Sequence, residues 1–196
     1  PYLMAYEKIN RRDNSKYNGM LNLTYEIKPW LKAIVRGGFD NIINSTKRHA
    51  PIGINATRDW GNTNKGYYNE KTEETFTANG DFILTAQGKI KKFTVDGLLG
   101  GSIYYYRNKY MDAATKNGIT VPGFYSLKAS VASPTIDSYL ANKQVNSLYG
   151  KVTIGYDNAV YLDITGRNDW SSTLPVDNRS YFYPSVSGAF AFTQLL

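Results

Sequence analysis

Apolar and polar residues alternate with a period of two along most of this chain, and this alternation restricts its fold more than any other feature. In the run 21–27, Leu, Leu, Tyr and Ile alternate with Asn, Thr and Glu. Because successive side chains of a strand point to opposite faces, such runs predict β-strands with one apolar and one polar face. The runs cover 21–27, 31–39, 76–86, 93–105, 148–156, 160–166 and 182–192. We therefore predict an all-β antiparallel meander of about seven strands.

The connections between these runs differ in length in a regular way. The short connections are Lys28–Trp30, Gln87–Lys89 and Asp157–Asn158, the long ones cover 44–71 and 112–142, and a medium one is Ser171–Arg179. In a meander, the short connections all fall at one end of the sheet and the long ones at the other. Bacterial outer-membrane barrels have this asymmetry, with short periplasmic turns and long extracellular loops.

Composition excludes several other classes of protein. The 196 residues include no cysteine, which excludes disulfides, thiolate metal sites and a cysteine nucleophile. The longest uncharged apolar stretch, Gly97–Tyr106, is too short for a transmembrane helix, which needs about 20 residues. The formal net charge is +7, but the basic residues are scattered, and the cluster Lys89–Lys92 flanks an expected turn. We therefore expect solvated turns and loops and no nucleic-acid groove.

The two faces of the expected strands suit lipid on one side and water on the other. The polar face carries Asn22, Glu26, Arg36, Asp40, Asp81, Asp96, Lys151, Asp163 and Arg167. A soluble core would not tolerate so many charges, whereas the lumen of a barrel does. Strands cross a bilayer only as a closed barrel, so seven strands are expected to be part of a larger one, of roughly 22 strands with a plugged lumen.

Aromatic residues near the strand ends have two interpretations. Trp30 beside a short turn, and the tyrosines Tyr104, Tyr105, Tyr106 and Tyr110, fit the girdles that line membrane interfaces. Plain β-propensity would also place tyrosines in half-exposed strands.

The sequence offers candidate binding residues and little that suggests catalysis. His49 is the single histidine, which excludes a multi-histidine metal site, and its expected place in a loop beside Arg48 does not suggest a Ser-His-Asp triad. We therefore expect no enzyme, metal or cofactor. Aromatic residues among Asn, Thr and Lys in the long loops could bind sugars, peptides or a docking protein. These residues are Trp60, Tyr67, Tyr68, Phe124, Tyr125 and Tyr139. The alternative is that their rings pack the loops against one another.

Two runs near the end of the chain carry a family resemblance. "GRNDWSSTLP" starts at Gly166, and "NRSYFYPSVSGAFAF" covers 178–192. Together they closely resemble a signature of the SusC/RagA type of TonB-dependent outer-membrane transporters of Bacteroidetes, and residues 18–39 resemble a strand pair of these proteins more loosely. In that family the motif formed here by Arg167, Asn168, Asp169 and Trp170 recurs at the outer end of a strand. We expect a structural role, in which Arg167 and Asp169 hold strand and loop together and Trp170 lies at the rim of the barrel. Direct substrate contact is the weaker alternative.

The resemblance implies a function for the whole protein. Members of the family carry an N-terminal plug, a TonB box and a barrel in the outer membrane, and they import glycans or peptides with a SusD-like surface lipoprotein and TonB. We therefore expect residues 1–196 to be an internal, multi-pass barrel segment without the plug and TonB box. The leading alternative is a soluble β-rich carbohydrate-binding or adhesin module. A passive porin and an outer-membrane enzyme are weaker alternatives.

Overall fold

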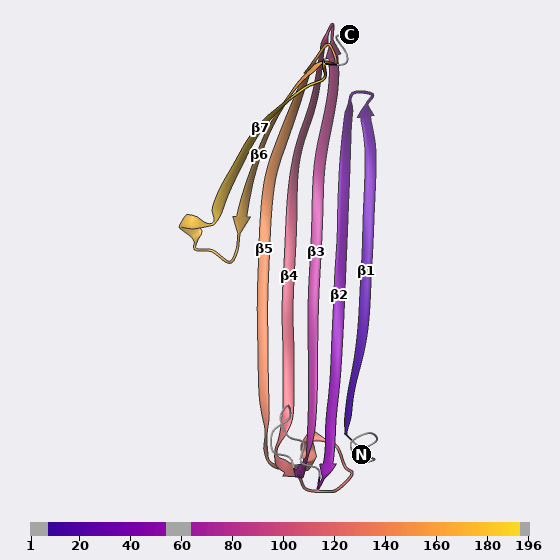
Figure 1. Ribbon diagram of the computed structural model, residues 1–196, viewed down its shortest axis with the longest axis vertical. Helices are drawn as coiled ribbons and strands as arrows, with labels where there is room; N and C mark the ends of the chain where they lie inside the picture. Colours follow the sequence, from indigo (N-terminus) through magenta and orange to yellow (C-terminus); the bar gives the residue numbers. More distant parts are fainter. Residues whose placement is uncertain (1–7, 54–63, 193–196) are drawn as a thin grey trace. The chain divides into compact units, whose positions relative to one another are not determined.

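The computed structural model describes residues 8–53 and 64–192, which contain seven β-strands and two single-turn 3₁₀-helices. The strands are β1 (Ile9–Lys28), β2 (Leu31–Ile52), β3 (Lys65–Ile90), β4 (Phe93–Ile119), β5 (Ser130–Tyr156), β6 (Val160–Ser171) and β7 (Ser180–Phe190), and the helices are η1 (Leu127–Ala129) and η2 (Val176–Asn178). They form one sheet in the order β1-β2-β3-β4-β5-β6-β7 (Figure 1). The predicted all-β meander is confirmed. None of the described residues belongs to a helix long and apolar enough to cross a membrane.

The chain divides into two compact units, each of which collects parts of several strands. The turn unit comprises Asn18–Phe39, Thr77–Tyr106 and the described part of Asn142–Leu196. The extension unit comprises the described parts of Pro1–Tyr17, Asp40–Phe76 and Arg107–Ala141. The turn unit contains β6, β7 and the tight turns, and the extension unit contains the ends of β2, β3, β4 and β5 at which the longer connections begin.

Within the turn unit, the strand register places the predicted apolar residues on one face. Val152 pairs with Ile164, and Ile164 pairs with Val186 on its other side. These side chains are not covered: Val186 is 68% exposed and Phe182 64% exposed. No large side chain among the described residues is fully buried. Among the described residues, the turn unit is therefore a single layer of sheet, and a soluble domain would need a second layer over this face to form a core.

The long connections are much shorter than predicted, because the strands continue into them. β2 ends at Ile52 and β3 begins at Lys65, while β4 ends at Ile119 and β5 begins at Ser130. The predicted loops 44–71 and 112–142 were wrong to this extent. Polar side chains on both faces remove the alternation signal, but the backbone ladder that holds the strands does not depend on it.

The strands are also longer than a membrane requires. β4 and β5 have 27 residues each, which corresponds to about 90 Å at about 3.4 Å per residue. A transmembrane β-strand needs only about 9–11 residues. In a membrane barrel, most of β4 and β5 would therefore lie outside the hydrocarbon layer.

The tight turns follow the sequence at two of three places. Pro29–Trp30 and Asp157–Ala159 connect strands as predicted. The third prediction, Gln87–Lys89, was wrong, because β3 continues to Ile90 and the turn falls at Lys91–Lys92. There Lys91 takes the left-handed conformation with φ 56°. Gly88 suggested a turn at this position, but it lies within β3.

A substitution in the β5–β6 turn tests its geometry. Asp157 and Asn158 have φ values of 51° and 56°, and the Ala159 N–H donates to the Tyr156 carbonyl at 3.0 Å, as in a type I′ turn. We expect Asn158→Val to lower the free energy of unfolding of the full-length protein by about 1–2 kcal/mol, because a β-branched residue is strained at positive φ. Asn158→Gly should be neutral in the same denaturant titration. Equal stability of the two variants would contradict this turn geometry.

Candidate functional site

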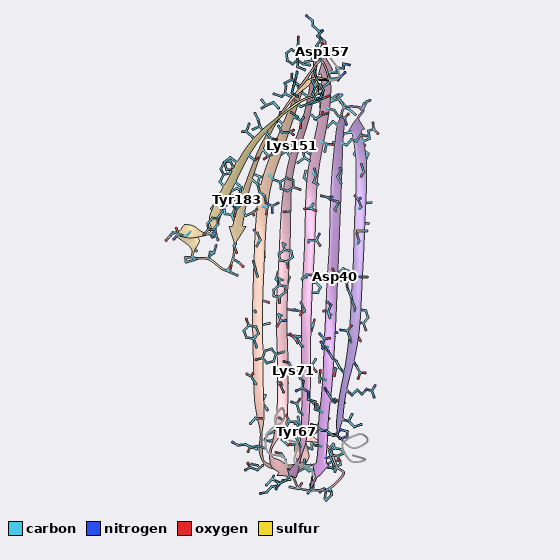
Figure 2. The ribbon with its side chains drawn as sticks, in the orientation of Figure 1. Asp40, Tyr67, Lys71, Lys151, Asp157 and Tyr183 are labelled. Atoms are coloured by element: carbon cyan, nitrogen blue, oxygen red, sulfur yellow. The ribbon has the colours of Figure 1, made fainter. Side chains whose placement is uncertain are left out.

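Four side chains of the extension unit form an aromatic and charged cluster on β3, β4 and β5, which we call the Tyr110 cluster: Lys71, Tyr110, Asp137 and Tyr139. The Tyr110 hydroxyl donates to Asp137 Oδ2 at 2.7 Å. The rings of Tyr110 and Tyr139 are stacked, with centroids 5.8 Å apart and planes at 26°. Lys71 Nζ lies 4.8 Å from the Tyr110 ring centroid, within cation–π range (Lys71 is labelled in Figure 2).

The electrostatics of this cluster keep Tyr110 a neutral hydrogen-bond donor. The hydrogen bond to Asp137 raises the pKa of Tyr110, and partial desolvation and the negative charge of Asp137 raise it further. Tyr139 is 52% exposed, so one ring of the stacked pair is open to a ligand. The cluster thus offers an accessible ring beside one cation and one anion. Such a surface can contact an apolar group and charged or hydroxyl groups of the same ligand.

A buried polar contact stands next to the cluster on β3. The side chain of Asn69 is only 3% exposed, and its amide donates to the Ala113 carbonyl at 3.0 Å and to Asp112 Oδ1 at 2.5 Å. Buried hydrogen bonds of this kind fix the position of neighbouring strands, since breaking them would leave unpaired polar groups. Asn69 therefore fixes the part of β3 that carries Lys71 relative to β4.

Tyr68, a predicted binding residue, is instead part of the packing between β3 and β4. It is 7% exposed, its N–H donates to Thr115 Oγ1 at 2.9 Å, and its hydroxyl donates to Glu70. Burial raises the pKa of Tyr68 to about 12, helped by the hydrogen bond and the charge of Glu70. Desolvation and the charge of Asp112 likewise raise the pKa of Tyr67, partly offset by Arg48.

The remaining predicted aromatic residues lie elsewhere. Phe124 and Tyr125 belong to the β4–β5 connection, where the Tyr125 ring stacks on His49 with centroids 3.9 Å apart. Desolvation lowers the pKa of His49. Trp60 lies outside the described residues. Of the five predicted residues that the structure describes, Tyr139 is the one in the Tyr110 cluster.

The Arg167–Trp170 motif of β6 divides between the two faces of the turn unit. Arg167 donates to Asp169 Oδ1 at 2.8 Å and to Ser147 Oγ of β5 at 3.0 Å. Its guanidinium also lies 5.7 Å from the centroid of the Tyr149 ring. These contacts tie β6 to β5 on the polar face and support the strand-pinning role that we propose for Arg167 and Asp169.

On the other face, Asn168 donates to Ser180 Oγ of β7 at 2.9 Å. Trp170, the next residue on that face, is half-buried beside a polar pocket that also involves Arg179. The motif therefore connects β6 to both of its neighbours.

Comparisons with known proteins agree on the kind of fold. No known protein-family model matches the chain. It is 23% identical over 194 residues to the TonB-dependent receptor P26 of Formosa agariphila, and 26% identical over 202 residues to the TonB-dependent receptor P3 of the same organism. It superimposes on the structure of the RagAB peptide transporter with a TM-score of 0.82 at 19% identity, over 96% of this chain. The fold is thus a segment of a large transmembrane β-barrel.

The matches are to proteins much longer than this chain. The two receptors align with 97% and 98% of this chain, but the chain spans only 20% and 19% of their length. It likewise spans 21% of the chain in the RagAB peptide transporter structure.

Proposed function

We propose that this chain, a barrel segment of the SusC/RagA type of TonB-dependent transporter, forms part of the wall of an outer-membrane importer of oligopeptides or glycans. The observation that carries the proposal is the single-layered sheet with an uncovered apolar face, which needs lipid on one side. The fold similarity to the RagAB peptide transporter supports it. This role requires no chemistry of bond breaking, so we propose a transporter wall and no enzyme.

The two units would serve the importer in different ways. The turn unit carries the apolar face that contains Val152, Ile164 and Val186 and would cross the bilayer, while the extension unit carries the Tyr110 cluster. Successive residues of β4 alternate between its two faces, so Tyr110, ten residues after Gly100, lies on the same face as Gly100. Gly100 lies against the ring of Tyr149, which belongs to the polar face. We therefore propose that the Tyr110 cluster faces the path of the substrate.

The chemistry of the cluster favours a peptide substrate over a glycan. Lys71 and Asp137 present opposite charges near one aromatic platform, which suits a zwitterionic chain with apolar side chains. A glycan would use the stacked tyrosines alone. The partners we propose follow from the family: a SusD-like lipoprotein, TonB acting through the plug region of the full-length protein, and outer-membrane lipid, but no nucleic acid.

Peptide uptake by the full-length transporter tests this proposal. We expect the double variant Tyr110→Ala/Tyr139→Ala to raise the KM for uptake of a fluorescent oligopeptide about tenfold, which corresponds to about 1.4 kcal/mol of lost binding. The maximal rate of uptake should change little, because the lost contacts weaken binding of the peptide equally in its first bound state and in the transition state of transport. The matched control is Tyr17→Ala, another exposed tyrosine of the extension unit that lies outside the cluster.

The outcomes separate the alternatives. An unchanged KM, or an equal rise in the Tyr17→Ala variant, would contradict a substrate role for the cluster. Uptake of a labelled oligosaccharide that depends on the same two tyrosines, with no peptide uptake, would make the substrate a glycan.

A further inference from the structure

A polar pocket lies at the end of β6, on the face of the turn unit that carries the apolar residues Val152, Ile164 and Val186. Its volume is about 460 Å³, and it is lined by Gln144, Asn146, Trp170, Ser171, Ser172 and Arg179. Asn146 and Trp170 are register partners, in step with Gly150 and Gly166 further along the same two strands, so the four residues share one face. Within the described chain, the Arg179 guanidinium makes no ion pair.

An apolar groove lies on the same face of the turn unit. Its volume is about 640 Å³, and its walls include Leu31, Leu84, Leu99, Val152, Ile164 and Phe182. Gly97, Gly150 and Gly166 form part of its lining, where a larger side chain would reduce the space. This volume is sufficient for a hydrocarbon chain, and the groove offers a ligand almost only apolar side chains.

The groove and the pocket follow one another along β6. Gly166 lines the groove and Trp170 lines the pocket, four residues or about 14 Å further along the strand. Between them the face turns polar, since Asn168 donates to Ser180 Oγ. A tryptophan at such a transition fits the boundary between hydrocarbon and headgroups, where its ring is apolar and its N–H is wet.

We infer that this face binds a single outer-leaflet lipid, with a net-anionic, phosphate-bearing headgroup in the polar pocket and an acyl chain in the apolar groove. The charge of Arg179 complements a phosphate, which a guanidinium binds through two parallel hydrogen bonds. Gln144, Ser172 and Trp170 supply donors for further headgroup oxygens. An anionic lipid combines a headgroup charge that would fit the polar pocket with a hydrocarbon chain that would fit the apolar groove, about 14 Å away along β6. The inference rests on the lipid-facing orientation of this face and not on import.

Native mass spectrometry of the full-length protein tests the site. The protein is released from mixed micelles that contain equal amounts of phosphatidylglycerol and phosphatidylcholine. We expect one phosphatidylglycerol to be retained in preference to phosphatidylcholine, because both headgroups carry a phosphate but the quaternary ammonium of phosphatidylcholine is repelled by Arg179. Arg179→Gln should reduce its occupancy at least fivefold, because the phosphate loses its cation. Gly97→Leu should reduce it by a similar factor by filling the groove, since a Cβ at Gly97 meets only the Ala86 carbonyl, at 3.9 Å.

Matched controls distinguish the site from general effects on the barrel. Gly188→Leu adds the same side chain on the same face outside the groove, and Lys143→Gln removes one exposed cation outside the pocket. Both should retain the lipid as the unchanged protein does. Equal retention in all variants, equal loss in the controls, or no preference for phosphatidylglycerol would overturn the inference. Displacement of the lipid by millimolar inorganic phosphate alone would also overturn the inference, because it would show that the groove contributes nothing to binding.

Discussion

Ile164→Arg is expected to lower the free energy of unfolding of the full-length protein in lipid vesicles by about 2–4 kcal/mol, and to reduce its amount in the outer membrane. Ile164 lies between Val152 and Val186 on the apolar face and is 44% exposed in the isolated sheet. In the membrane, that exposed surface meets hydrocarbon, where an arginine near the midplane costs about this much. A denaturant titration from vesicles measures the change.

The neighbouring residue provides the control for this prediction. Thr165 points to the opposite, polar face of β6, where its register partners are Lys151 and Ser185 (Lys151 is labelled in Figure 2). Thr165→Arg should therefore change the free energy of unfolding by less than about 1 kcal/mol, as for a surface substitution. If Thr165→Arg were as costly as Ile164→Arg, or if both were harmless, the assignment of the two faces would be wrong.

Gly100→Val is expected to cost about 1–3 kcal/mol of stability for a different reason, which is overpacking on the polar face. A Cβ at Gly100 would lie 2.6 Å from the nearest carbon of the Tyr149 ring, so the ring would have to move. Tyr149 also lies under the guanidinium of Arg167, which is tied to Asp169. Displacing the ring therefore disturbs the contacts that hold β5 to β6. The unfolding midpoint of the full-length protein measures the effect.

A double-mutant cycle isolates the cause of this effect. In a Tyr149→Ala background the ring is absent, so Gly100→Val should cost at least about 1 kcal/mol less than it does in the unchanged protein. The same cost in both backgrounds would show that the Tyr149 ring does not occupy the space over Gly100. Gly88→Val, at a glycine whose Cβ would meet nothing within 4 Å, serves as the matched glycine substitution.

The sequence predicted the turn unit well because its strands carry different side chains on their two faces. The alternation around Val152 and Ile164 specified both the strands and their apolar face, and the register agrees with it. The ends of β4 and β5 in the extension unit were predicted as a loop because polar and apolar residues are mixed on both of their faces there, and the period-two signal depends on a difference between faces.

The candidate site could be predicted only in part. Residue type pointed to Tyr139, but Tyr110 was interpreted as a girdle residue or as a product of plain β-propensity, and Lys71 and Asp137 were not singled out. Asp137 and Tyr139 lie two residues apart on β5, and Tyr110 and Lys71 join them only through the cross-strand pairing of β3, β4 and β5, which was hidden by the loop prediction. Treating 65–76 and 130–141 as strands would have placed these side chains on one face. Burial, which removes Tyr68 from the candidates, likewise depends on that pairing.

The most direct test of the barrel-wall account is the environment of alternate residues along β6 and its neighbours. The chain contains no cysteine, so single cysteines can be introduced at Val152, Ile164 and Val186, and at Lys151, Thr165 and Ser185, in the full-length protein and then spin-labelled. The account predicts that the first three labels collide with oxygen dissolved in the bilayer and the other three with a water-soluble relaxation agent. Equal accessibility to both agents at all six positions, or apolar residues that see only water, would contradict a lipid-facing wall.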